Sequence, residues 1–308
     1  MAQRVKEYYR SDFRKDFFTA PELDRSFGYA LAYHIAQKLK DFKDPVLSEL
    51  GGGSGALAYD ILSYLRERQS DLFEGLSYYI YDFSPRLISL QKERLKPFEG
   101  KVFWTEEFFP MKGVIFSNEF FDCMPVHVIK EGKELFIKDG EELWLDLFEK
   151  RVQEVLKRMN YENFNHVLEI STDCIDLLEK VGKNLLEGYH IIIDYGYTTE
   201  EILRFPHGTV VGYRDHCLYN KPSGDMDITA HVNFSLIEEY GKDYGLEGVA
   251  LMSLKDLLLN SPPFLEELES LSSSSSPEDI ERLSRLKTLL ISMGYRFKVF
   301  IQKKLQTS

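Results

Sequence analysis

Residues 45–62, Pro-Val-Leu-Ser-Glu-Leu-Gly-Gly-Gly-Ser-Gly-Ala-Leu-Ala-Tyr-Asp-Ile-Leu, join an apolar run to a glycine-rich turn and then to an amphipathic pattern. This order predicts a strand over 45–50 and a helix over 55–67. Gly51, Gly53 and Gly55 lack a Cβ atom, so the backbone can turn tightly there and a ligand can approach it closely. A plain strand-to-helix turn in an α/β protein is the alternative.

The spacing of these glycines separates several kinds of nucleotide site. It is G-x-G-x-G, with Glu49 two residues before the first glycine. It therefore differs from the G-x-G-x-x-G of dinucleotide sites, and it lacks the Lys-Ser/Thr pair of a phosphate-binding P-loop. The E-x-G-x-G-x-G form resembles motif I of the class I S-adenosyl-L-methionine (SAM) methyltransferases. That resemblance implies SAM as the cofactor, with its phosphate-free amino-acid and ribose parts lying over the glycines.

Composition excludes several classes of protein. The chain has 308 residues, 44% of them hydrophobic, and a formal net charge of −12. This acidity argues against a nucleic-acid partner, because phosphate binding normally needs a basic face. No apolar run is long enough to span a membrane. The three cysteines fit neither a disulfide framework nor a zinc site, and we expect a cytoplasmic protein because such thiols suit a reducing compartment.

Strand and helix patterns alternate through much of the chain, which predicts a Rossmann-like parallel sheet with helices on both faces. The first helix, 24–40, carries apolar residues at a helical period, Phe27, Leu31, Ile35 and Leu39. Further strands are expected at 77–82, 101–104, 113–117, 189–194, 246–252 and 295–302. Further helices are expected at 84–95, 173–187 and 278–292.

The alternation breaks in two places. Residues 126–138 predict a β-hairpin followed by a charged helix at 146–159, and residues 206–233 are polar and loop-rich. The serine run 272–276 indicates a flexible loop. We therefore predict an N-terminal helical segment at 1–44 and a methyltransferase domain at 45–308. That domain would carry insertions at about 120–172 and 197–235, which would select the substrate.

Polar residues follow two of the expected strands. Asp82 ends the strand at 77–82, where a carboxylate in nucleoside-binding α/β folds accepts hydrogen bonds from the ribose hydroxyls. Asn118, Glu119 and Asp122 follow the strand at 113–117, and the two acids could hold a nucleophile against the sulfonium methyl group. The alternatives are helix capping by Asp82 and Asn118, with the acids on the surface.

The segment before the sheet predicts a helix start. Thr19 is an expected cap, Pro21 suits the first turn, and Glu22 would complete a capping box. Two histidines, His216 and His231, lie beside aspartates, where hydrogen-bonded scaffolding competes with acid–base catalysis. Their spacing does not predict a metal site.

Several of these blocks together resemble the MidA family, the mitochondrial complex I assembly methyltransferases and their bacterial relatives. The resemblance runs in order from about residue 8 to the C-terminal strand. It implies a SAM-dependent methyltransferase fold. It also implies a functional role for Thr19, Pro21 and Glu22, for which the local pattern predicts only a helix start. The family's usual glutamate after the second strand is Asp82 here, one methylene shorter. The blocks that carry the resemblance lie at residues 18–22, 27–28, 49–55, 117–122, 124–126, 194–196, 213–216 and 227–234.

We therefore predict a methyltransferase that acts on a protein, with an arginine of a respiratory complex I subunit as the target that the resemblance implies. Cofactor contacts are expected from Thr19, Pro21, Glu49, Gly51, Gly53, Gly55, Asp82 and Asn118. Acceptor contacts are expected from Glu22, Glu119 and Asp122. The alternatives are a non-catalytic SAM-binding assembly factor, an NAD(P)-dependent oxidoreductase and a small-molecule methyltransferase. The sequence leaves the oligomeric state open.

Overall fold

The computed structural model describes residues 19–138, 141–214, 217–219 and 226–305, which fall into two units. The first unit, here the sheet unit, comprises Phe18–Glu119, Lys180–Asp194 and Gly245–Ser308. The second, here the inserted unit, includes Phe120–Glu179 and Tyr195–Tyr244. The domain boundaries expected from the sequence, 1–44 and 45–308, stay a prediction.

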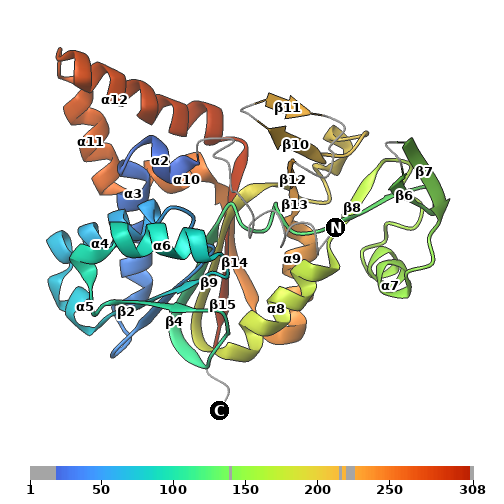
Figure 1. Ribbon diagram of the computed structural model, residues 1–308, viewed down its shortest axis with the longest axis horizontal. Helices are drawn as coiled ribbons and strands as arrows, with labels where there is room; N and C mark the ends of the chain where they lie inside the picture. Colours follow the sequence, from blue (N-terminus) through green and yellow to red (C-terminus); the bar gives the residue numbers. More distant parts are fainter. Residues whose placement is uncertain (1–18, 139–140, 215–216, 220–225, 306–308) are drawn as a thin grey trace. The chain divides into compact units, whose positions relative to one another are not determined.

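The sheet unit holds the main sheet, in the strand order β14-β15-β9-β4-β1-β2-β3. The pairs β1–β2, β1–β4, β2–β3 and β4–β9 are parallel, whereas β14–β15 is antiparallel. Figure 1 shows β4, β9 and β15 side by side. This arrangement confirms the predicted α/β class. The strands are β1 (Val46–Leu50), β2 (Ser77–Tyr81), β3 (Val102–Thr105), β4 (Met111–Asn118), β9 (Leu185–Tyr197), β14 (Glu247–Ser253) and β15 (Phe297–Lys304).

Helix α3 (Ser26–Leu39) shows why the apolar period predicts this fold correctly. Phe27, Leu31, Ile35 and Leu39 are all fully buried. They lie on one helix face, which is the face that packs against the core. The helix packs against β4, α4 and α11. The other helices of this unit are α2 (Ala20–Leu23), α4 (Ala56–Arg68), α5 (Ser70–Gly75), α6 (Pro85–Arg94), α10 (Leu254–Leu259), α11 (Pro262–Ser272) and α12 (Pro277–Lys287).

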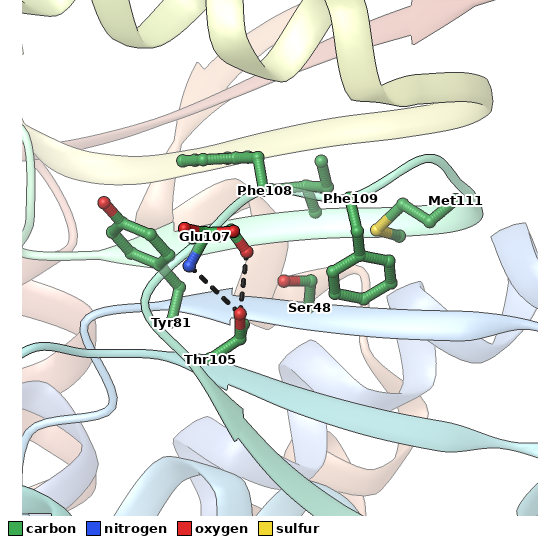
Figure 2. Close-up of a pocket in the computed structure, with 8 residues that line it drawn as sticks. Ser48, Tyr81, Thr105, Glu107, Phe108, Phe109 and Met111 are labelled. Atoms are coloured by element: carbon green, nitrogen blue, oxygen red, sulfur yellow. Dashed lines mark hydrogen bonds between the residues drawn. The ribbon is translucent and has the colours of Figure 1, made fainter.

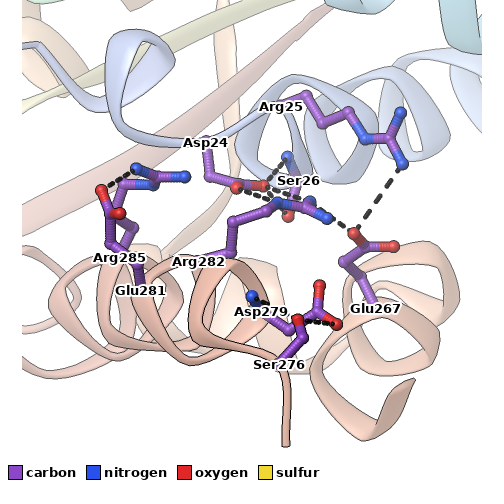
Figure 3. Close-up of polar contacts among 9 residues, drawn as sticks. All are labelled: Asp24, Arg25, Ser26, Glu267, Ser276, Asp279, Glu281, Arg282 and Arg285. Carbon is purple, nitrogen blue, oxygen red and sulfur yellow. Dashed lines mark hydrogen bonds and ion pairs between the residues drawn. The ribbon is translucent and has the colours of Figure 1, made fainter. Parts of the chain in front are cut away.

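In the sheet unit, a cluster of charged side chains links residues from early and late in the sequence. This cluster, here the polar lock, consists of Asp24, Glu267 and Arg282. Arg282 on α12 donates to both carboxylate oxygens of Asp24, at 3.1 and 3.3 Å, and also pairs with Glu267 on α11. Asp24 in turn accepts the backbone amide and the hydroxyl of Ser26, at the start of α3. Figure 3 shows Arg282 between the two carboxylates. The C-terminal helices therefore hold the segment between α2 and α3.

The inserted unit contains two small sheets, with the orders β7-β6-β5-β8 and β11-β10-β12. Its core gathers twelve buried apolar side chains, among them Tyr161, Ile170 and Tyr197. The strand β13 (Val232–Asn233) pairs with Gly196 and Tyr197 at the end of β9. The remaining elements are β5 (His127–Lys130), β6 (Lys133–Lys138), β7 (Glu141–Asp146), α7 (Lys150–Arg158), β8 (Leu168–Ile170), α8 (Thr172–Asn184), β10 (Val211–Arg214), β11 (Cys217–Tyr219), β12 (Asp227–Thr229) and α9 (Phe234–Gly241).

The structure confirms the predicted hairpin and corrects two other expectations. Strands β5 and β6 meet at Glu131 and Gly132, both with positive φ, as a tight hairpin turn requires. The helix expected from residue 146 begins only at Lys150, because 141–146 pairs with β6 as strand β7. Within the expected loop 206–233 lie β10, β11 and β12. The serine run forms a loop as predicted, because 273–276 connects α11 to α12, and Ser276 at its end caps α12 by accepting the Asp279 amide at 3.1 Å.

Candidate functional site

The glycine turn follows β1 at the carboxyl edge of the sheet. Gly51, Gly53 and Gly55 all have positive φ, at 73°, 50° and 78°. A Cβ atom at Gly53 would have no heavy atom within 4 Å, so this side of the turn is open. The amide of Gly55 closes the turn onto the Gly52 carbonyl at 2.8 Å, and Gly55 then starts α4. Both the left-handed backbone and the open side suit a ligand that lies against the main chain.

Asp82 lies next to this turn, at the end of β2. Its side chain is buried, with 6% exposed. One carboxylate oxygen accepts the Ser84 amide at 2.9 Å, and the other accepts the Gln91 amide group at 2.7 Å. Burial raises the pKa of Asp82, while these two hydrogen bonds oppose the rise. Because Ser84 caps α6, the bond from its amide to Asp82 supports the start of that helix. Asp82 is also linked to the glycine turn, since Gln91 donates to both Asp82 and the Gly53 carbonyl.

Glu49 lies inside the sheet unit, with its side chain against a tyrosine. Its carboxylate accepts the Tyr78 hydroxyl at 2.8 Å, and only 2% of the residue is exposed. Burial raises the pKa of Glu49 to about 8, and the charge of Asp82 adds to the rise. The hydrogen bond to Tyr78 accounts for this acid structurally, and its role in cofactor binding stays a prediction.

Glu119 follows β4 in a strained conformation. Its φ is 51°, in the left-handed region that residues other than glycine seldom adopt. The same oxygen, Oε1, accepts the Ala20 amide at 3.2 Å and the Asn118 side-chain amide at 3.1 Å. Burial raises the pKa of Glu119 to about 8, and the charges of Asp194 and Glu22 contribute. Three carboxylates therefore gather where β4 and β9 end.

The short helix α2 joins Glu119 to the glycine turn. Besides the Ala20 amide, which binds Glu119, it carries Glu22, whose Oε1 accepts the Ser54 hydroxyl at 3.2 Å. The predicted capping box is wrong: the Thr19 side chain forms no capping hydrogen bond, although Pro21 does stand in the first turn. The Glu22 amide donates instead to the Thr19 main-chain carbonyl at 3.0 Å, and the Glu22 side chain accepts Ser54. The structure thus brings Glu22, Glu119 and the glycine turn together.

Two polar atoms of the β4 end are buried without a hydrogen-bond partner within the described part of the chain. They are the Ser117 hydroxyl and the Asn118 side-chain carbonyl oxygen. Buried polar groups are normally paired, so such atoms in native proteins point to a ligand, a water molecule or an ion. Helix capping by Asn118 was the alternative, and in the described chain no helix begins directly after it; its side-chain amide donates to Glu119.

Asp122 and His231 belong to the inserted unit. Asp122 is buried, and its backbone carbonyl accepts the Ala230 amide at 2.9 Å. His231 stacks on Tyr195, with ring centroids 6.1 Å apart, and its backbone amide donates to Thr209. His216 lies outside the described residues. The predicted role of Asp122 stays a prediction. Among the described residues no group of three metal-ligating side chains occurs.

A small pocket on the other face of the sheet takes no part in this arrangement (Figure 2). Ser48 and Tyr81 line it, and their side chains point away from those of Glu49 and Asp82 because neighbours alternate along a strand. Aromatic side chains close it: Tyr81 lies 4.8 Å from Phe108 between ring centroids. The pocket is therefore an aromatic packing feature.

Sequence reasoning missed Gln91, which contacts both Asp82 and the Gly53 carbonyl. A signal was available, because Leu87 and Gln91 are the two buried residues of α6 and stand four apart. A polar residue on the apolar face of a helix must find partners, and here the partners belong to the glycine turn and Asp82. Ser54 and Asp194 are further residues near the acids that the sequence did not place there.

The site suits SAM better than a phosphate-bearing nucleotide. Gly53 leaves its side of the turn open, and the buried Asp82 carboxylate lies beside the turn. The acids Glu22, Glu119 and Asp194 favour a positively charged ligand and disfavour phosphate. In the described chain, helices long and apolar enough to cross a membrane are absent.

Comparisons with known proteins agree with this chemistry. Residues 30–251 match a family profile described as "Putative S-adenosyl-L-methionine-dependent methyltransferase". The chain is similar to "Protein arginine methyltransferase NDUFAF7 homolog, mitochondrial" of Drosophila melanogaster, with 26% identity across 92% of this chain and 74% of that protein. It is also similar to "Protein arginine methyltransferase NDUFAF7, mitochondrial" of Xenopus laevis, with 25% identity across 72% of this chain and 59% of that protein.

Two solved structures from Burkholderia thailandensis are also similar. One is a "likely methyl transferase" bound to S-adenosyl-homocysteine (SAH), with a TM-score of 0.78 and 27% identity over 95% of this chain and 80% of that one. The other is a native crystal structure from the same superfamily, with a TM-score of 0.84 and 26% identity over 99% of this chain and 86% of that one.

The predicted cytoplasmic location is wrong by these comparisons. Both curated relatives are named as mitochondrial proteins. The error has a simple origin, because cysteines that fit no disulfide framework indicate a reducing environment and do not distinguish one reducing compartment from another.

Proposed function

We propose that this chain, which belongs to the family of S-adenosyl-L-methionine-dependent methyltransferases matched by residues 30–251, methylates an arginine side chain of a protein. The family match, the two curated relatives and the Burkholderia structure with SAH confirm the MidA resemblance, the enzyme class and SAM as the cofactor. The protein acceptor and the arginine are the proposal. The relatives named as protein arginine methyltransferases support it.

We assign the cofactor to the edge that holds the glycine turn. Gly51, Gly53 and Gly55 would lie under it, and Asp82 would accept its ribose hydroxyls. Asn118 and Thr19 flank the same edge through their contacts with Glu119 and α2. When bound, SAM supplies a methyl group on a positively charged sulfur atom.

Glu119 is our candidate for orienting the acceptor. An arginine guanidinium carries a positive charge and donates hydrogen bonds, which a carboxylate accepts in pairs. As the new nitrogen–carbon bond forms and the carbon–sulfur bond breaks, the guanidinium must lose one proton. Glu119 would receive it on its carboxylate, with Glu22 offsetting the positive charge nearby. Positive charge on the bound ligands lowers the raised pKa of Glu119 and makes it available as a base.

One observation carries the proposal: a carboxylate in a strained, left-handed conformation lies beside the glycine turn, held there by the Ala20 amide. Backbone strain of this kind costs about 1–3 kcal/mol and gathers at functional sites. An acid that served only the surface would have no reason to keep it. Glu119 is linked to the turn through α2, where Ala20 binds Glu119 and Glu22 binds Ser54.

The experiment is transfer of labelled methyl groups. The chain is incubated with methyl-labelled SAM and a lysate of its own source, and labelled peptides are located by mass spectrometry. The resemblance to complex I assembly methyltransferases makes respiratory complex I subunits the first acceptors to inspect. The proposal predicts a labelled arginine, and less label with Glu119→Gln. If the label appeared only in the low-mass fraction, the acceptor would be a small molecule and the proposal of a protein acceptor would be wrong. Wild-type rates with both Glu119→Gln and Asp122→Asn, at unchanged SAM binding, would overturn the roles of these acids.

A further inference from the structure

Gln91 is a fully buried polar residue in the middle of α6. A buried amide that found no partners would cost several kcal/mol of transfer free energy, roughly 2–7. Gln91 instead satisfies both ends of its side chain. Its position four residues after the buried Leu87 directs it toward the sheet.

The hydrogen bonds of Gln91 connect three separate segments. Its Nε2 donates to the Gly53 carbonyl at 3.0 Å and to Oδ2 of Asp82 at 2.7 Å. Its Oε1 accepts the Trp104 indole N–H at 2.8 Å. These partners fix which end of the amide is which, because two acceptors need the nitrogen and one donor needs the oxygen.

The glycine turn also packs on Gln91. A Cβ atom at Gly52 would stand 3.1 Å from Nε2 of Gln91 and 2.7 Å from a methyl group of Ile80. A Cβ atom at Gly55 would stand 3.2 Å from the Cα atom of Gln91. The inner side of the turn therefore lies directly on this residue, whereas the outer side at Gly53 is open.

We propose that Gln91 is a positioning residue of the SAM site, which fixes the glycine turn, the Asp82 carboxylate and Trp104 in one arrangement before the ligand arrives. This inference rests on the proposed placement of SAM along Gly53 and Asp82. The role needs an amide. Glutamate could accept from Trp104, but it could not donate to Gly53 or Asp82 when ionised, and methionine could do neither. A site held in its bound geometry binds more tightly because less ordering is left to binding.

The test is a calorimetric titration of SAH into the wild type, Gln91→Met and Gln91→Glu. Methionine keeps the approximate volume of glutamine and removes every hydrogen bond. We expect Kd to rise about 10- to 100-fold in Gln91→Met, as one or two hydrogen bonds to a charged partner would give. We expect a larger rise in Gln91→Glu, which places a second carboxylate beside Asp82. Leu87→Ala is the matched control, because it damages the same buried face one turn earlier without touching the turn.

A spectroscopic signature separates positioning from core filling. The chain has two tryptophans, Trp104 and Trp144, so a Trp144→Phe background leaves Trp104 as the reporter. We expect its emission maximum to shift in Gln91→Met, where the indole loses its acceptor, and to stay close to the wild-type value in Gln91→Glu and Leu87→Ala.

The outcomes distinguish two failures. An Asp82→Ala variant that binds SAH as the wild type does would overturn the proposed site, and the role of Gln91 with it. If Asp82→Ala weakens binding but Gln91→Met leaves Kd within about twofold, or if Leu87→Ala weakens binding as much as Gln91→Met, only the positioning role fails. Weak binding in Gln91→Met together with a wild-type Kd in Leu87→Ala supports it.

Discussion

The sheet unit and the inserted unit each contain a buried polar residue that organises a loop, and the two residues differ in one respect. Gln91 in the sheet unit binds the glycine turn and Asp82, so its partners border an open edge. Glu169 in the inserted unit accepts the Thr209 amide and hydroxyl and the Val210 amide. Its three bonds all serve the chain's own loop before β10. In our proposal the first arrangement prepares a ligand site, whereas the second holds a loop of the inserted unit.

The strand ends of the sheet unit can also be compared with the β6–β7 hairpin of the inserted unit. In the inserted unit the β6–β7 hairpin leaves several apolar side chains exposed, with Ile137 59% accessible, and Phe148 between β7 and α7 is 80% accessible. In the sheet unit the polar groups at the strand ends are largely buried, including Asp82 and Asp194. In our proposal the cofactor and Glu119 belong to the sheet unit, and the inserted unit, with Asp122, contributes to selection of the acceptor.

The largest expected effect is on chemistry in the sheet unit. Glu119→Gln should lower kcat by about 10²- to 10⁴-fold, the range for loss of a positioned base. The Kd of SAH should change by less than about threefold, because glutamine keeps the oxygen that accepts the Ala20 amide. Single-turnover methyl transfer and calorimetry measure the two quantities. An equal loss in both would assign Glu119 to cofactor binding instead.

Asp82→Ala should weaken SAM binding by roughly 10- to 100-fold, as loss of charge-assisted hydrogen bonds to the ribose would give. Asp71→Ala serves as the control, because Asp71 is an exposed acid on α5 of the same unit. Calorimetry of both variants measures the effect. Equal SAM affinity of the two variants would contradict a contact between Asp82 and the ribose.

A substitution in the polar lock tests the stability of the sheet unit without changing a proposed catalytic or cofactor-binding residue. Arg282→Met leaves Asp24 buried without its main cationic partner. We expect the free energy of unfolding of the sheet unit to fall by roughly 2 kcal/mol, less than for a fully buried pair because Arg282 is partly exposed. Trp104 emission during urea unfolding reports this unit, and Trp144 reports the inserted one. An unchanged Trp104 transition would contradict the role of the lock.

Which features of the two units could be predicted from the sequence depends on how far apart in the chain the interacting residues lie. The glycine turn, Asp82 and the strand–helix alternation are local patterns, and the structure places them at one sheet edge. The capping box does not form: the Glu22 amide donates to the Thr19 main-chain carbonyl, and the Glu22 side chain accepts Ser54, thirty-two positions away in sequence. Gln91 was missed for a similar reason, since its partners lie on three separate segments. Strands β10–β12 were missed because their antiparallel pairing depends on partners that no local period announces.

Glu169→Gln tests the other side of the comparison. Glutamine keeps one acceptor oxygen but turns an N–H group toward a loop of donors. We expect the unfolding free energy reported by Trp144 to fall by about 1 kcal/mol, while the Kd of SAH stays within about twofold. A clear loss of SAH affinity would break the distinction between the two polar residues.

The smallest expected effect is on pH dependence. Since the pKa of Glu119 is raised to about 8, its carboxyl group is mostly neutral below that pH. A cationic ligand prefers the ionised form, so SAM affinity should rise as pH increases through about 8, by several-fold between pH 6.5 and 8.5. SAH, whose sulfur is neutral, should show a weaker trend. The ratio of the two affinities should become independent of pH in Glu119→Gln, and an unchanged slope there would contradict the assignment.

The most direct measurement is a crystal structure of this chain grown with SAH. The account predicts the ligand against the open side of Gly53, with both ribose hydroxyls within hydrogen-bond distance of the Asp82 carboxylate and the Gln91 contacts unchanged. Ligand density elsewhere on the chain, or a glycine turn covered by the protein's own side chains, would contradict it.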